Sequence, residues 1–105
     1  MIVNLTPHAI NFVLPSGEVR VIAPSGGVAR CSTSTSPAGE VDGIPLSRTT
    51  YGEVTGIPEP SPGKLFVVSA LVRAAVPSRA DVASPGELVR DAAGVVVGCR
   101  SLVVN

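Results

Sequence analysis

Proline and glycine interrupt this sequence so often that a long helix cannot form. The chain carries ten prolines and eleven glycines in 105 residues, and both residue types end helices and mark turns. Hydrophobic residues make up 45% of the chain, yet Phe12, Phe66 and Tyr51 are its only aromatic residues. The core must therefore be built mostly from aliphatic residues, many of them β-branched, and these favour strands.

Short apolar runs between the turn residues indicate many short strands and one helix. Ser69 can cap a short helix over 70–76 that Pro77 ends, although one long strand through Val72 is an alternative. The strands are expected at 9–14 and 19–23, which pair as a hairpin, at 28–33, at 64–69, and at 88–90 and 95–104, which pair around the turn 91–94. This pattern predicts a mainly β chain, a small β-sandwich or barrel-like fold with one short helix, as a single compact domain over 1–105.

A seven-residue segment near the middle of the chain occurs twice. Gly39–Pro45 reads Gly-Glu-Val-Asp-Gly-Ile-Pro, and Gly52–Pro58 repeats it with Thr55 in place of Asp42. Each copy is too short to be a repeat domain. We interpret each copy as a short strand that ends in a turn, and we expect the pair to hold the hydroxyl-rich residues around it in one shared hollow.

Charge and cysteine usage exclude several classes of protein. The formal net charge is zero and no basic run is present, which argues against binding of long nucleic acid or of a membrane surface. The longest apolar stretch, 65–76, is too short to span a bilayer. No signal peptide is apparent, and Cys31 and Cys99 lack the spacing of a metal site. We expect reduced thiols and a cytoplasmic location.

Hydroxyl side chains gather in the middle of the sequence around one arginine. Arg48 precedes Thr49, Thr50 and Tyr51, and serines and threonines are dense from 32 to 55. A guanidinium, hydroxyls and an aromatic ring can clamp a phosphate and stack on a base. The alternative is that these residues populate the solvated face of strands and turns.

A second candidate lies at the start of the chain, where Asn4-Leu5-Thr6-Pro7-His8 contains the only histidine. His8 could act as a general base or bind phosphate. Asn4 and Thr6 could join it in holding a ligand, or could instead organise the turn before Pro7.

No complete catalytic or metal-binding signature is present. Glu40, Asp42 and Glu53 lack the spacing of a metal loop, and solvated or arginine-paired carboxylates are the simpler interpretation. His8 with Cys31 or Glu40 could form a hydrolytic site, but any chain with these residue types offers that combination. The expectation is a protein that is not an enzyme and that uses no metal and no cofactor.

Five segments together resemble a family of small proteins, usually labelled hypothetical, of tailed bacteriophages and prophages. The segments are 4–8, 39–45, 48–54, 67–72 and 97–100. The resemblance extends over nearly the whole chain and implies a phage-linked accessory protein inside the host cell. It implies no catalytic residue.

These observations lead to a hypothesis and an alternative. The hypothesis is a non-enzymatic phage protein that sequesters a small phosphate-bearing nucleotide signal as an anti-defence sponge. We expect it to be a homo-oligomer, because several copies together can bury enough of the ligand. Arg48 would hold phosphate, Tyr51 would stack, and Thr49, Thr50 and His8 would hydrogen-bond. The alternative is a protein–protein interaction module, either a virion accessory part or a direct inhibitor of a host enzyme.

Overall fold

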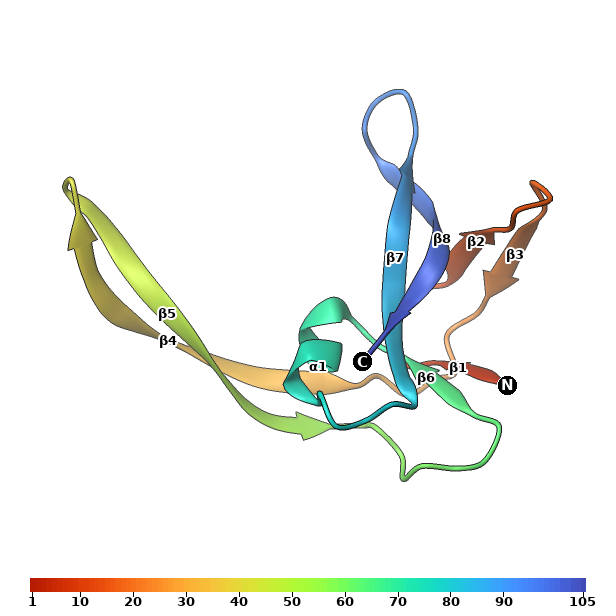
Figure 1. The fold of residues 1–105 in the computed structure, drawn as a ribbon, viewed down its shortest axis with the longest axis horizontal. Helices are drawn as coiled ribbons and strands as arrows, with labels where there is room; N and C mark the ends of the chain where they lie inside the picture. Colours follow the sequence, from red (N-terminus) through yellow and green to blue (C-terminus); the bar gives the residue numbers. More distant parts are fainter.

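The computed structural model describes residues 1–105 as a β-sheet body from which one long hairpin projects (Figure 1). The elements are β1 (Ile2–Asn4), β2 (Ile10–Val13), β3 (Val19–Ile22), β4 (Arg30–Val41), β5 (Ile44–Thr55), β6 (Leu65–Val67), α1 (Ala70–Ala75), β7 (Val82–Arg90) and β8 (Val96–Val104). The prediction of a mainly β chain with one short helix is confirmed.

The body is a single six-stranded sheet in the order β1-β6-β7-β8-β2-β3, and it curves into a nearly closed, barrel-like shape. The hairpins β2–β3 and β7–β8 are antiparallel, as their turns predict. The pairs β1–β6, β6–β7 and β2–β8 are parallel. Parallel pairing needs long crossover connections, and α1 lies in the connection between β6 and β7.

The helix α1 begins where its cap residue predicts. The hydroxyl of Ser69 accepts a hydrogen bond from the backbone N–H of Val72 at 3.3 Å, and the helix ends before Pro77. The other end is satisfied from the far end of the chain, because the side-chain amide of Asn105 donates to the carbonyl of Val76 at 3.0 Å. The alternative of one long strand through Val72 is therefore wrong.

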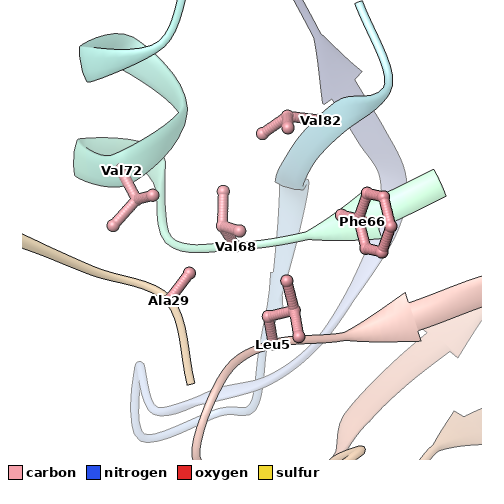
Figure 2. Packing of buried hydrophobic residues seen from close by; sticks show 6 residues of the cluster. All are labelled: Leu5, Ala29, Phe66, Val68, Val72 and Val82. Atoms are coloured by element: carbon pink, nitrogen blue, oxygen red, sulfur yellow. The ribbon is translucent and has the colours of Figure 1, made fainter. Parts of the chain in front are cut away.

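A small aliphatic core joins the sheet, the helix and the base of the projecting hairpin. Figure 2 shows its six buried residues, which come from the chain after β1, the chain before β4, β6 and the residue after it, α1 and β7: Leu5, Ala29, Phe66, Val68, Val72 and Val82. Cys31 and Val54, at the base of the hairpin, pack against this cluster. Phe66 is the only aromatic residue in it, in keeping with the aliphatic composition.

The strands β4 and β5 form an antiparallel two-stranded sheet of their own, which we call the arm. The strand expected at 28–33 starts at Arg30 and continues to Val41, and its partner runs without a break from Ile44 to Thr55. The prediction of short strands in this region is wrong, because the polar residues between 32 and 53 extend a hairpin into solvent instead of lining a compact body.

The two copies of the doubled segment have different structures. In the first copy, Asp42 and Gly43 both have positive φ angles, of 52° and 78°, and form the two-residue turn at the tip of the arm. In the second copy, Thr55 still belongs to β5 and pairs with Arg30. Aspartate tolerates a positive φ whereas β-branched threonine resists it. The one residue that differs between the copies therefore separates a turn from a strand, and the expectation of two equivalent strand-and-turn units is wrong.

The arm makes the molecule much less compact than its length predicts. The Cα radius of gyration is 16.4 Å, whereas a compact domain of this length has about 13 Å. The accessible surface is 6777 Å², against about 5,500 Å² for a folded monomer of this mass. The chain thus exposes about 1,300 Å² more than a monomer of its mass normally does.

Candidate functional site

The hydroxyl-rich segment around Arg48 lies in the middle of the arm, on strand β5. Side chains alternate between the two faces of a strand, so Arg48 and Thr50 belong to one face of the arm, and Thr49 and Tyr51 belong to the other. The sequence-predicted cluster is therefore divided between two faces.

The face that carries Arg48 is lined with hydroxyl groups. Arg48 lies opposite Ser36, and Thr50 lies opposite Ser34 on the neighbouring strand. The Oγ atom of Ser34 and the Oγ1 atom of Thr50 are 2.6 Å apart and form a hydrogen bond. Arg48 forms no side-chain hydrogen bond and no ion pair within the chain, so its guanidinium is available to a binding partner.

The opposite face carries Tyr51, which lies across from Thr33, and Thr49, which lies across from Thr35. The Tyr51 side chain is exposed. Because a two-stranded ribbon has no third strand to curve around a ligand, Arg48 and Tyr51 do not enclose a hollow within one chain.

The opening motif forms a turn that is held by the buried side chain of Asn4. The amide of Asn4, which is 1% exposed, donates to the carbonyls of His8 at 2.9 Å and of Ile22 at 3.1 Å. Its Oδ1 atom accepts from the backbone N–H of Thr6 at 3.0 Å and from the Thr6 hydroxyl at 2.6 Å. These four bonds use the full hydrogen-bonding capacity of the Asn4 side chain, as the turn-organising alternative predicts.

His8 is held in this turn by its backbone only. Its carbonyl accepts from Asn4, and its side chain is exposed and forms no hydrogen bond. The turn connects β1 to β2, whereas Arg48 lies on the arm, which extends away from the sheet (Figure 1). Asn4, Thr6 and His8 are therefore separated from the Arg48 segment within one chain.

The structure contains one pocket, and sequence reasoning did not find it. It has a volume of about 310 Å³ and lies where β2, β7 and β8 meet. Its lining is largely apolar: Ala9, Ile10, Asn11, Pro85, Leu88, Val96, Val97, Gly98 and Cys99. None of the sequence-predicted site residues lines it. The signal that was available is the run of three valines from 95 to 97, which follows a turn and stays exposed.

The acidic residues and cysteines form no reactive cluster. Glu40 and Asp42 are exposed at the tip of the arm, and no group of three or more metal-binding side chains is present. Cys31 and Cys99 are both free thiols. Burial raises the pKa of the Cys99 thiol above its ordinary value, which keeps it in the protonated, poorly nucleophilic form.

The loop after the arm is tied to the segment between α1 and β7 by Arg79, which also forms an ion pair with Asp81. The Nε and Nη2 atoms of Arg79 donate to the two carboxylate oxygens of Asp81, each at 2.8 Å, and Nη2 also donates to the carbonyl of Pro58. The hydrogen bonds from Arg79 lower the pKa of Asp81 below its ordinary value, and the same pair raises the pKa of Arg79. This pair is a structural clamp.

The single helix has six residues, and no helix in the structure is both long and apolar enough to cross a membrane. No family model, no curated protein and no solved structure matches this chain.

Proposed function

We propose that this protein is a non-enzymatic interaction module that binds a protein partner through its arm. The observation that carries the proposal is the arm itself, a ribbon of two 12-residue strands that is exposed along nearly its whole length. The resemblance to small proteins of tailed bacteriophages agrees with an accessory role of this kind.

The energetics of an isolated hairpin support a partner. A two-stranded ribbon on its own is marginally stable in water, and three or more strands or a packed face are needed for independent stability. Only the base of the arm packs on the core, through Cys31 and Val54. A binding surface that covers the rest would supply the missing burial.

The excess surface has the size of a specific interface. Stable interfaces bury about 800 Å² on each partner, and this chain exposes about 1,300 Å² beyond the surface of a normal folded monomer. Large apolar side chains contribute to this surface at the tip, where Val41, Ile44 and Leu46 are exposed. Exposed apolar groups of this kind mark interaction sites.

The test is a chain whose arm is shortened without disturbing the body. Thr33 and Tyr51 face each other across the ribbon, so replacing residues 34–50 by Asn-Gly leaves a short hairpin with a favourable two-residue turn. Both forms, each carrying the same affinity tag, are used as bait in a lysate of the cells that produce the protein. The full-length chain is expected to retain a protein partner in stoichiometric amount, and the shortened chain is expected to lose it. Untagged copies of the chain itself count as such a partner.

The control for folding is the melting curve of the shortened chain. Because only the base of the arm packs on the core, the shortened chain is expected to unfold cooperatively, as the full-length chain does. Retention of the same partners in the same amounts by both baits would overturn the proposal.

A second candidate function is the sequestration of a small phosphate-bearing nucleotide. The observation that favours it is the free guanidinium of Arg48, which lies on the same face as the Ser36, Ser34 and Thr50 hydroxyls. One charged group with three neighbouring hydroxyls suits a phosphate. Because this face is open, a second surface from another copy would have to close the site and provide a ring for the base.

Isothermal titration with cyclic dinucleotides and ADP-ribose-type nucleotides tests the second candidate. If Arg48 holds phosphate, we expect the heat of binding to disappear in Arg48→Ala. It should persist in Arg20→Ala, because Arg20 is another arginine without a partner in the chain. Absence of heat with every nucleotide at protein well above micromolar would reject this function and leave the interaction module unaffected.

A further inference from the structure

Among the exposed apolar surfaces of this chain, two lie on different parts of the molecule and differ in shape. The first is the tip of the arm, and the second is the pocket where β2, β7 and β8 meet. Their chemistry is alike, and neither has a partner within the chain.

The tip presents its apolar side chains on one face. Val41 and Ile44 lie opposite each other next to the turn, and Leu46 points to the same face because it is two residues from Ile44. The residue opposite Leu46 is Gly39, which has no side chain to cover it. Ile44 is 64% exposed, so the tip is an apolar knob that no other part of the chain covers.

The pocket presents a matching hollow. It has a volume of about 310 Å³ and its walls are mostly aliphatic. Leu88 at its wall is 51% exposed, and Val96 and Val97 are exposed as well. Displacement of water from a hollow with aliphatic walls by an apolar side chain is favourable.

The knob and the hollow cannot meet within one chain. The arm extends away from the sheet, and its tip is the part of the molecule farthest from β2 and β8 (Figure 1). The base of the arm is fixed in the core through Ala29, Cys31 and Val54. Any contact between the tip and the pocket must therefore join two molecules.

We propose that the apolar tip of the arm, formed by Val41, Ile44 and Leu46, inserts into the pocket between β2, β7 and β8 of a second copy of this chain. This inference rests on the arm being a binding element and names its partner. A lipid surface suits the tip less well, because Glu40 and Asp42 flank the apolar residues and would be repelled by anionic headgroups.

The area agrees with this arrangement. In a head-to-tail assembly each copy uses two surfaces, its own arm and its own pocket, and a standard interface would bury about 1,600 Å² per copy in total. The excess surface of about 1,300 Å² is of that size. Because the two surfaces differ, the assembly is heterologous and grows into a closed ring or an open filament.

Two substitutions separate the surfaces. Ile44→Glu disables the tip and leaves the pocket intact, whereas Leu88→Glu disables the pocket and leaves the tip intact. The matched control is Val104→Glu, which places the same charge at an exposed valine of β8 outside the pocket. Light scattering after size exclusion gives the mass of each form. The protein is loaded at about 10 to 300 μM, because this range detects interfaces of micromolar affinity.

The expected result has a distinctive form. Wild type and Val104→Glu are oligomers, and each of the two other variants alone is a monomer. A mixture of Ile44→Glu with Leu88→Glu gives a dimer and nothing larger, because one intact tip can enter one intact pocket. Circular dichroism melting of each variant confirms that the monomers are folded.

Each other outcome overturns the inference. A monomeric wild type over the whole concentration range excludes the second copy as the partner. An oligomer that is lost in Ile44→Glu but not in Leu88→Glu shows that the tip binds elsewhere, which leaves the arm as the binding element. An oligomer that survives both substitutions and also the shortening of the arm shows that the copies associate through neither the tip nor the pocket, whereas the proposed function fails only if the shortened chain retains the same partners.

Discussion

The side-chain amide of Asn4 donates a hydrogen bond to the carbonyl of Ile22 at 3.1 Å. Asn4 ends β1 and Ile22 ends β3, and these two strands are the outermost strands of the six-stranded sheet. The bond therefore joins the two edges of the sheet. The Asn4 carbonyl adds to the closure by accepting from the backbone N–H of Ser25, which follows β3. The side-chain amide and the backbone carbonyl of Asn4 thus both join the two edges at the barrel seam.

Replacing Asn4 is expected to destabilise the whole body. Asn4→Ala leaves the Ile22 carbonyl and the Thr6 N–H without their partner, which costs about 2–4 kcal/mol in the free energy of unfolding. Urea unfolding measures this loss. The matched control is Asn11→Ala, which removes an exposed asparagine side chain with one hydrogen bond and is expected to cost about 1 kcal/mol or less. Equal losses in the two variants would contradict the role of Asn4 at the seam.

The doubled segment provides a matched pair of glycine substitutions. Gly43 and Gly56 occupy the same position in the two copies and have positive φ angles of 78° and 88°. A Cβ atom on Gly43 meets nothing within 4 Å, whereas one on Gly56 would lie 2.5 Å from the carbonyl oxygen of Val28. Gly43→Ala is expected to cost about 1 kcal/mol from backbone strain alone. Gly56→Ala adds a backbone clash, so about 3 kcal/mol or more is expected.

Thermal unfolding of the two alanine variants measures the difference. Gly56 lies at the base of the arm beside the core, so its substitution lowers the main transition. Gly43 lies at the tip and leaves that transition almost unchanged. A main transition that falls equally in both variants would show that the approach of Gly56 to Val28 does not constrain the fold.

The Arg79–Asp81 pair predicts a loss of stability in acid. The hydrogen bonds from Arg79 lower the pKa of Asp81 in the folded chain below the ordinary value of 3.8. The stabilisation is therefore fully present above that value and is lost as the pH falls through the lower folded pKa. Asp81→Asn is expected to cost about 1–2 kcal/mol at pH 7.

Urea titrations of wild type and Asp81→Asn across pH 2 to 7, roughly the range in which carboxylates titrate, follow this loss. The difference between the two proteins is expected to be constant above pH 5, about one unit above the ordinary pKa, and to shrink towards acid. A difference that stays constant down to the lowest pH would show that the carboxylate charge adds nothing.

Asn105 is expected to stabilise the end of α1. Its amide donates to the carbonyls of Val76 and Arg79, and its Oδ1 atom accepts from Arg73. Asn105→Ala is expected to cost about 1 kcal/mol. Asn105→Asp should cost at least as much, because a carboxylate keeps the bond to Arg73 but loses both donors. Wild-type stability of the aspartate variant by urea unfolding would contradict the capping role.

Local sequence signals predicted much of the body. The hairpin β2–β3, the Ser69 cap and the turn before β8 depend on neighbouring residues, and such signals are readable from composition and spacing. The parallel pairs β1–β6 and β2–β8 were not predicted, because their partners are far apart in the sequence and no local pattern specifies them. The closing role of Asn4 has the same cause, since its acceptor at Ile22 is 18 residues away.

The structure of the arm was predicted wrongly because the two copies of the doubled segment were treated as equivalent. The similarity of the two copies indicated two equivalent turns, but Asp42-Gly43 is a strong hairpin signal and Thr55-Gly56 is not. Recognising that difference would have predicted one long hairpin and would have placed Arg48 and Tyr51 on opposite faces of it. The pocket could not be predicted from the sequence, because its walls come from three strands that only the tertiary fold brings together.

The shallow attachment of the arm has a consequence for how this protein can evolve. Between Ser32 and Glu53 the ribbon contributes nothing to the buried cluster, so mutations there escape the folding constraints that govern the barrel. Insertions, deletions and substitutions in that stretch alter the exposed surface of the arm and leave the packing of the barrel intact. The sequence of the arm can therefore change faster than that of the barrel.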